Sequence, residues 1–247
     1  MRLTIIGCGD AFGTGGRLQT SFHVATASTQ FLIDCGASSL IGMRRLGLDP
    51  NDVDTVYLTH LHGDHFGGLP WLLIDAQYIG KRTRPLTVAG PKGTEARFTA
   101  AAEALYPGST RSKRAYDLRF IEYAERQSLQ RDGVTVTPFE VHHPSGATPY
   151  ALRFEADGRS FAFTGDTGWV EALCDAARGT DLLISESYQY DVPLEIHLDF
   201  KTIDANFDRL GTKRILLTHM GEAMLACSGE VDPARYLVSH DGMVLDL

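Results

Sequence analysis

Residues 59–65 read Thr-His-Leu-His-Gly-Asp-His, and this stretch decides the fold. Three imidazoles and one carboxylate fall within six positions, from His60 to His65. Neutral imidazole is the commonest metal ligand in proteins, and carboxylates bind the same borderline metals. The alternative interpretation is a polar loop that is rich in histidine by chance. We predict that this run supplies ligands to two metal sites.

Strand ends predict where the remaining ligands come from. Residues 55–58 are mainly β-branched, aromatic or apolar, which predicts a buried strand that delivers His60 at its C-terminal end. At three distant places a polar side chain follows an apolar strand in the same way: His143, Asp166 and His219. Rigid strand ends hold ligands within the tight distances that a metal requires. We therefore expect these three side chains to join the run at 60–65.

The donor types predict how the ligands divide between two metals. Three imidazoles form the first predicted site: His60, His62 and His143. Two imidazoles and a carboxylate form the second: Asp64, His65 and His219. Asp166 has two oxygens and can bind both metals, which lie about 3.5–4 Å apart in hydrolytic sites. The predicted cofactors are two divalent metal ions, with Zn²⁺ favoured and Mn²⁺ or Fe compatible.

Alternatives remain for the distant ligands when each is considered alone. His142 competes with its neighbour His143 for the third imidazole position. His219 could be a hydrogen-bonded core histidine, and Asp166 could cap the helix predicted over 169–177. Only the coincidence of all three with the run at 60–65 favours the metal interpretation.

Composition indicates an ordinary globular chain. At 247 residues, with 43% hydrophobic and 22% charged residues, one domain spanning 1–247 is the simplest expectation. No apolar run approaches the roughly 18 residues that a membrane span needs. The N-terminus enters a strand directly, without the apolar stretch of a signal peptide, so a cytoplasmic location is expected.

Charge and cysteine content argue against two other kinds of site. The net charge of −8 argues against non-specific nucleic-acid binding, although two basic clusters lie at 81–84 and 111–114. The four cysteines are far apart and form no C-x-x-C pair, so a thiolate zinc site is not expected.

The order of predicted elements indicates an α+β fold. Strands are expected near 3–6, 21–25, 30–33, 86–89, 119–123, 134–141, 150–155, 161–164, 182–185, 214–217 and 244–245. Helices are expected over 38–46, 70–79, 94–105 and 169–177, and from a cap at Thr202 to Gly211. Two sheets between helical layers would fit this order.

The ligand motif resembles that of the metallo-β-lactamase superfamily. The resemblance is carried by H-x-H-x-D-H at 60–65, Thr-Gly-Asp at 164–166 and Leu-Thr-His-Met at 217–220, and it extends over nearly the whole chain. It implies an αββα sandwich of two mixed β-sheets flanked by helices. The glycine-rich N-terminal stretch and the sequence at 58–70 resemble the corresponding sequences of the ribonuclease Z-like branch. In relatives the third imidazole often stands three residues before a glycine, which selects His143, before Gly146, over His142.

The predicted catalytic residues are Asp64, which is also a ligand, and two more that the same resemblance implies. Ribonuclease Z carries a Glu and a His in short motifs whose counterparts here are Glu186 and His197, although the surrounding residues differ. A carboxylate that orients an imidazole raises the pKa of that imidazole and leaves it able to donate a proton. The alternatives are a structural ion pair for Glu186 and a loop histidine for His197.

The implied function is a dinuclear metal-dependent hydrolase, a phosphodiesterase of ribonuclease Z-like type that uses a metal-bound hydroxide. Its substrate would be a small-molecule or nucleotide/RNA phosphodiester, and a homodimer is a further expectation. The sequence lacks the protruding Gly/Pro-rich basic arm that grips transfer RNA in ribonuclease Z, since residues 108–118 are basic but short. The alternatives are a lactonase, thioesterase or β-lactam hydrolase on the same metal core, an iron-dependent redox enzyme, and a non-catalytic binding protein.

Overall fold

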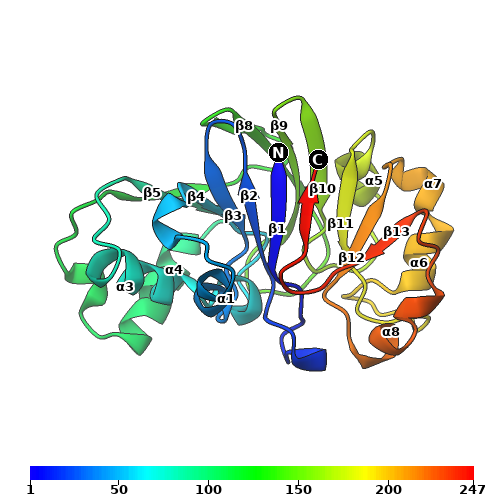
Figure 1. The fold of residues 1–247 in the computed structure, drawn as a ribbon, viewed down its shortest axis with the longest axis horizontal. Coiled ribbons are helices and arrows are strands. Elements are labelled where there is room, and N and C mark those ends of the chain that lie inside the picture. Colours follow the sequence, from blue (N-terminus) through cyan, green and yellow to red (C-terminus); the bar gives the residue numbers. More distant parts are fainter.

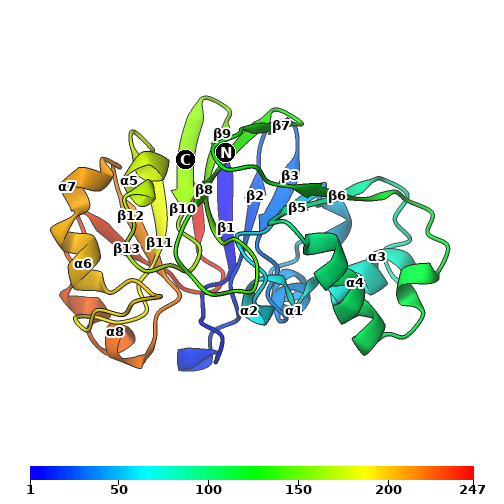
Figure 2. The same ribbon diagram turned by 180° about the vertical axis from the view of Figure 1, so that it is seen from behind.

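Two seven-stranded mixed sheets pack face to face, with helices on the outer side of each (Figures 1 and 2). The computed structural model describes all residues, 1–247. The first sheet has the strand order β14-β1-β2-β3-β4-β5-β6, and the second has the order β13-β12-β11-β10-β9-β8-β7. This architecture confirms the predicted αββα sandwich.

The first sheet and its helices come mainly from the N-terminal half of the chain. Its strands are β1 Arg2–Gly7, β2 Ser21–Ala25, β3 Gln30–Ile33, β4 Thr55–Tyr57, β5 Leu86–Gly90, β6 Leu118–Glu122 and β14 Val244–Asp246. Its helices are α1 Ser39–Arg45, α2 Gly63–Phe66, α3 Leu69–Tyr78 and α4 Thr94–Leu105.

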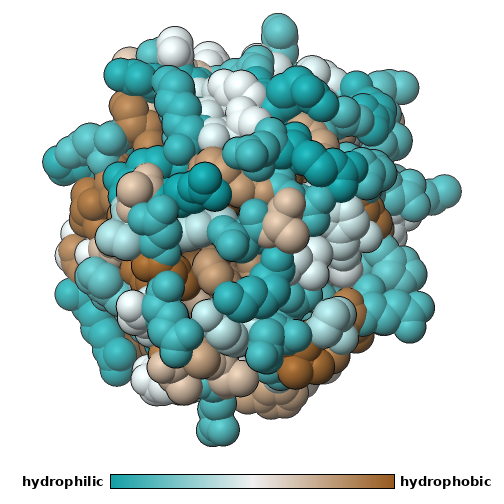
Figure 3. Space-filling model, turned by 90° about the vertical axis from the view of Figure 1, so that its right-hand side faces the viewer, coloured by the Kyte–Doolittle hydropathy of each residue, from teal (hydrophilic) through white to brown (hydrophobic).

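The second sheet comes from the C-terminal half. Its strands are β7 Leu129–Arg131, β8 Val134–Glu140, β9 Tyr150–Ala156, β10 Arg159–Phe163, β11 Leu182–Glu186, β12 Ile215–Thr218 and β13 Tyr236–Val238. Its helices are α5 Ala172–Ala177, α6 Phe200–Ala205, α7 Phe207–Leu210 and α8 Glu222–Ala226. The face around α6 to α8 carries mainly hydrophilic side chains with apolar ones interspersed (Figure 3).

The central strands are apolar on both faces because each face is covered. Phe31 of β3 packs between the sheets, whereas the next residue, Leu32, packs in the core of the outer helical layer. On β11, Ile184 points between the sheets and Leu183 points outward. Phe31 stacks on Phe154 of the opposite sheet with ring centroids 5.5 Å apart. Burying such a side chain contributes about 1.5–3 kcal/mol, so these runs fix which face of each strand meets the other sheet.

Strand direction gathers the polar loops at one edge of the sandwich. Strands β3 to β6 are mutually parallel, and so are β10 to β13. Strand β8 runs in the same direction as β10, because both are antiparallel to β9. The carboxyl ends of these strands meet at the lower edge in Figure 1, where β1 also ends.

Several boundaries differ from the sequence-based expectations. The short strands β7 and β13 were not predicted. The helix expected from Thr202 to Gly211 is two helices, α6 and α7, and the side chain of Asp199 caps the first by accepting the N–H of Thr202. Asn206 lies between them with non-helical backbone angles. No helix of the fold is both long enough and apolar enough to cross a bilayer.

Candidate metal centre

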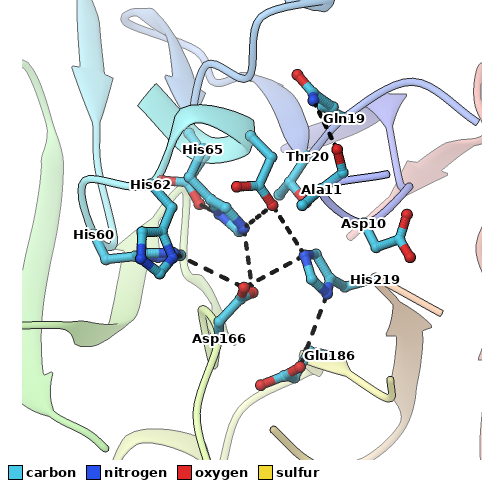
Figure 4. Close-up of polar contacts among 12 residues, drawn as sticks. Asp10, Ala11, Gln19, Thr20, His60, His62, His65, Asp166, Glu186 and His219 are labelled. Atoms are coloured by element: carbon cyan, nitrogen blue, oxygen red, sulfur yellow. Dashed lines mark hydrogen bonds and ion pairs between the residues drawn. The ribbon is translucent and has the colours of Figure 1, made fainter. Parts of the chain in front are cut away.

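All seven predicted ligand residues lie together where loops leave the strands, several of them visible in Figure 4. One cluster contains His60, His62 and His143, and a second contains Asp64, His65, Asp166 and His219. Within each cluster the candidate ligand atoms all lie within 4.8 Å of one another. The folded chain therefore groups these residues as their donor types predicted.

Asp166 lies between the two clusters. Its Oδ1 is 3.2 Å from Nε2 of His65, and its Oδ2 is 3.4 Å from Nε2 of His219. On the other side, Oδ2 is 3.9 Å from Nε2 of both His60 and His143. One carboxylate therefore faces imidazoles of both groups, which is the placement that a shared ligand needs.

Unpaired polar atoms point into this space. Nε2 of His60, Nε2 of His65 and Oδ1 of Asp166 are buried and have no hydrogen-bond partner. A buried polar atom without a partner costs about 1–3 kcal/mol. Divalent metal ions would satisfy these atoms, and the imidazole and carboxylate donor set suits zinc. The residues present thus fit the predicted metal ions.

A buried carboxylate, Asp34, organises the imidazoles from behind. Its Oδ2 accepts the Nδ1–H of His65 at 2.7 Å, and its two oxygens accept the N–H and hydroxyl of Thr59 at 2.8 Å. The Thr59 hydroxyl in turn accepts Nδ1–H of His60 at 3.0 Å. In its neutral form, each ring is thereby held in the tautomer whose Nε2 lone pair faces the cluster.

The other imidazoles are fixed in a related way. Nδ1–H of His143 donates to the carbonyl of Ile196 at 2.9 Å, which directs Nε2 towards Nδ1 of His62, 3.0 Å away. His219 adopts the left-handed region, with φ 53°, and its N–H donates to the carbonyl of Cys8 at 2.9 Å. Such a backbone conformation costs about 1–3 kcal/mol in a residue other than glycine, so the surroundings must hold this ring in place.

The charges around the clusters favour cations. Burial, together with His65, keeps the pKa of His60 well below its ordinary value, so His60 is a neutral donor. Burial alone would raise the pKa of Asp166, but His219 and His65 hold it well below its ordinary value. For His65, burial alone would lower the pKa, but the carboxylates of Asp166, Asp34 and Asp64 raise it well above 6.5. The second cluster thus concentrates negative charge that a divalent cation can neutralise.

The predicted catalytic pair, Glu186 and His197, lies beside the clusters. Oε2 of Glu186 accepts Nδ1–H of His197 at 2.8 Å, and Oε1 accepts the N–H of Thr167. Burial, followed by the charge of Asp166, raises the pKa of Glu186 to about 7. Burial alone would lower the pKa of His197, but the hydrogen bond and charge of Glu186 raise it above 6.5. The buried carboxylate thus orients the imidazole and favours its protonated form.

A pocket of about 280 Å³ opens over the clusters. It is lined by predicted ligands and His197, which we call its floor, and also by Tyr188 and Ile196. Phe12 also lines the pocket, although the side chain is 84% exposed. A larger hollow, of about 460 Å³, lies over the β9–β10 turn but contains none of the clustered imidazoles. The donor chemistry therefore identifies the smaller pocket as the candidate site.

Residues that were not predicted as ligands lie outside the two clusters, but one of them, Asp34, supports the site. His142 is 57% exposed on its side chain and lies 3.8 Å from Glu195, apart from either cluster. The four cysteines are free and belong to neither group. Arg82, from the first basic cluster, is buried and donates to backbone carbonyls. The sequence analysis missed Asp34, although this residue directly follows the apolar strand β3, much as His143 and Asp166 each lie three residues after the end of a strand.

Sequence comparison places the chain among known proteins. A family model described as "Anti-Pycsar protein Apyc1" matches residues 1–242. The ribonuclease Z of Mycobacterium bovis (strain BCG / Pasteur 1173P2) is 27% identical over 239 residues, covering 89% of this chain and 85% of the relative. A relative of that name agrees with the predicted resemblance to the ribonuclease Z-like branch.

Two solved structures share the fold over the whole chain. The metallo-β-lactamase fold protein YhfI from Bacillus subtilis superposes with a TM-score of 0.80 at 21% identity and covers 99% of both chains. A diphosphatase from the PhnP family has a TM-score of 0.78 at 20% identity and covers 100% of this chain and 97% of its own. These likenesses confirm the predicted metallo-β-lactamase fold.

Proposed function

The chain belongs to the family described as anti-Pycsar protein Apyc1, and from this membership and the geometry of the site we propose that it is a metal-dependent phosphodiesterase. Relatives named ribonuclease Z and the PhnP-family diphosphatase support hydrolysis at phosphorus. The observation that carries the proposal is the Glu186–His197 pair at 2.8 Å beside the clustered ligands. An alkoxide leaving a phosphodiester needs a proton, and this pair can supply one.

We assign two divalent metal ions, preferably Zn²⁺, to the clusters. His60, His62 and His143 would hold one ion, Asp64, His65 and His219 would hold the other, and Asp166 would contribute to both. When bound, these ions supply Lewis acidity, which lowers the pKa of water towards about 7 and offsets charge on phosphoryl oxygens. Asp64, predicted as catalytic, acts in this scheme as a ligand.

The protein's own part in the reaction is positioning and proton transfer. The imidazole of His197 is held at Nδ1 by Glu186, and the side chain is 18% exposed towards the pocket that it lines. Nε2 of His197 then delivers its proton to the leaving oxygen. The Thr167 N–H fixes the second oxygen of Glu186, so the carboxylate cannot rotate away from the imidazole.

The size of the pocket favours a small or nucleotide diester. Ligand pockets usually measure about 300–1,000 Å³, and this one, at about 280 Å³, is just below that range. The connection between α4 and β6, residues 106–117, is short and contains only one turn of 3-10 helix, Ser109–Arg111. It therefore offers little extended surface for gripping a folded RNA.

Metal analysis and a substrate panel test the proposal. Bis(p-nitrophenyl) phosphate, adenosine 3′,5′-cyclic phosphate and a transfer-RNA precursor are compared with a lactone, a thioester and a β-lactam. We expect about two ions per chain and hydrolysis of the small diesters. Turnover of the lactone or thioester with no diester cleaved would overturn the proposal, and iron with oxygen-dependent turnover would favour the redox alternative.

The shared ligand gives a separate test of the two-metal assignment. Asp166→Ala removes the carboxylate that faces both clusters, and we expect it to lower kcat/KM by roughly 10²-fold or more. Asp117→Asn, on an exposed side chain remote from the clusters, is the matched control. Full metal loading and wild-type turnover in Asp166→Ala would exclude the shared site. The cytoplasmic location and the homodimer stay predictions.

A further inference from the structure

Phe12 is the most exposed large apolar side chain of the protein, at 84%, and it lines the candidate active-site pocket. Exposed apolar side chains are common on protein surfaces, and exposure by itself does not indicate a role. Phe12 differs because one pocket joins its ring to the predicted ligands at the floor. A single molecule bound in that pocket can therefore touch both.

The loop that carries Phe12 is tied down at several points. Asp10, itself 1% exposed, accepts the N–H of Phe12 at 3.1 Å and the N–H of Thr14 at 2.9 Å. The carbonyl of Ala11 accepts Nε2–H of Gln19 at 3.2 Å, as Figure 4 shows. The backbone that presents the ring is thus fixed before a ligand arrives, which lowers the entropy lost on binding.

The root of the same loop is attached to the candidate centre. The carbonyl of Cys8, four residues before Phe12, accepts the N–H of His219. Tyr188 lines the pocket, with its ring 5.0 Å from that of His197. The same pocket lining therefore combines polar groups suited to a metal-bound phosphate with two aromatic side chains, Phe12 and Tyr188, which suits a nucleotide.

We propose that Phe12 is the stacking platform for the nucleobase of the phosphodiester substrate, an inference that rests on the proposed function. Every base has a flat π-face, so a single exposed ring binds bases of different sequence. The substrate class is then a nucleotide diester whose phosphate reaches the floor while its base covers Phe12. Phe12 contributes to substrate binding and specificity, and it takes no part in proton transfer.

Calorimetric titration of the metal-loaded protein tests this role without turnover. The probes are adenosine 5′-monophosphate and ribose 5-phosphate, which differ only in the base. We expect Phe12→Ala to weaken binding of the nucleotide about tenfold and to leave ribose 5-phosphate unchanged, whereas Phe12→Trp retains nucleotide binding. Ile79→Ala, at a side chain 70% exposed on the surface and outside the pocket, is the matched control and should change neither.

Kinetics separate this inference from the proposed function. In Phe12→Ala, KM for adenosine 3′,5′-cyclic phosphate should rise about tenfold while kcat is retained. The stacking role is overturned if both probes weaken equally, if neither does, or if the wild-type protein binds the nucleotide no more tightly than ribose 5-phosphate. Phe12-dependent nucleotide binding with no cleavage of any diester would support the platform and reject the phosphodiesterase.

Discussion

Asp34 accepts the Nδ1–H of His65 at 2.7 Å, and both side chains are completely buried. The bond leaves Nε2 of His65 directed at Asp64 and Asp166, at 3.4 and 3.2 Å. Partners of this kind fix the orientation and tautomer of a ligand and increase its basicity. Asp34 is therefore a positioning residue of the proposed centre.

Asp34→Asn should lower metal affinity about 10–100-fold, because the amide holds the imidazole less firmly than the carboxylate does. Asparagine tolerates the left-handed backbone at this position, where φ is 56°, so the fold should survive. Competition with a chromophoric chelator measures the affinity, with Asp117→Asn as the exposed control. An affinity equal to that of the wild type would show that Asp34 has no role in orienting the ligand.

His197→Ala should slow diesters with poor leaving groups by about 10²–10⁴-fold. Activated aryl esters should lose much less, because their leaving group departs without a proton. Kinetics of an alkyl diester and of bis(p-nitrophenyl) phosphate make the comparison, and metal content checks that the centre is intact. Equal slowing of both substrates would argue against a proton-donor role.

The pH profile should report the Glu186–His197 pair. Glu186 raises the pKa of His197, so activity on alkyl diesters should fall as the pH rises through that raised value. Glu186→Gln removes the carboxylate and lowers the pKa of the imidazole, which should move the alkaline limb of kcat/KM to lower pH. Glu195→Gln, at a side chain 88% exposed, should leave the limb where it is. A limb that is unmoved in Glu186→Gln would contradict the pairing.

Metal binding should stabilise the fold. A ligand at about 1,000 times its Kd stabilises the native state by about 4.1 kcal/mol. For a chain of this size, that corresponds to a rise in Tm of roughly 8–16 °C. Thermal unfolding with saturating Zn²⁺ and with EDTA measures the difference, and Asp166→Ala should show a smaller one. Equal Tm values would contradict the proposed ligand set.

Much of the site was predictable because four ligands come within three residues of the end of a strand: His60, His143, Asp166 and His219. The parallel strands are apolar on both faces, so a polar residue such as Asp166 shortly after one stands out in the sequence. The same signal marks Asp34 after β3, but no distant partner in the sequence indicates its hydrogen bond to His65. No feature of the sequence around Phe12 indicates a site, and only the folded chain shows that this loop borders the pocket.

The errors in secondary structure have local causes. Strands β7 and β13 contain three residues each, too few for a clear alternation of apolar and polar residues. The helix predicted to run to Gly211 divides at Asn206, a residue with low helix propensity.

The bond from the N–H of His219 to the carbonyl of Cys8 has a consequence for synthesis on the ribosome. The first predicted ligand, His60, is synthesised long before the last, His219. The edge of strand β1 stays unpaired until β14 has been made. A nascent chain therefore cannot complete the second cluster until His219 has been made. A chain truncated before His219 would lack both this ligand and its bond to Cys8, and it would leave the ribosome without a finished centre.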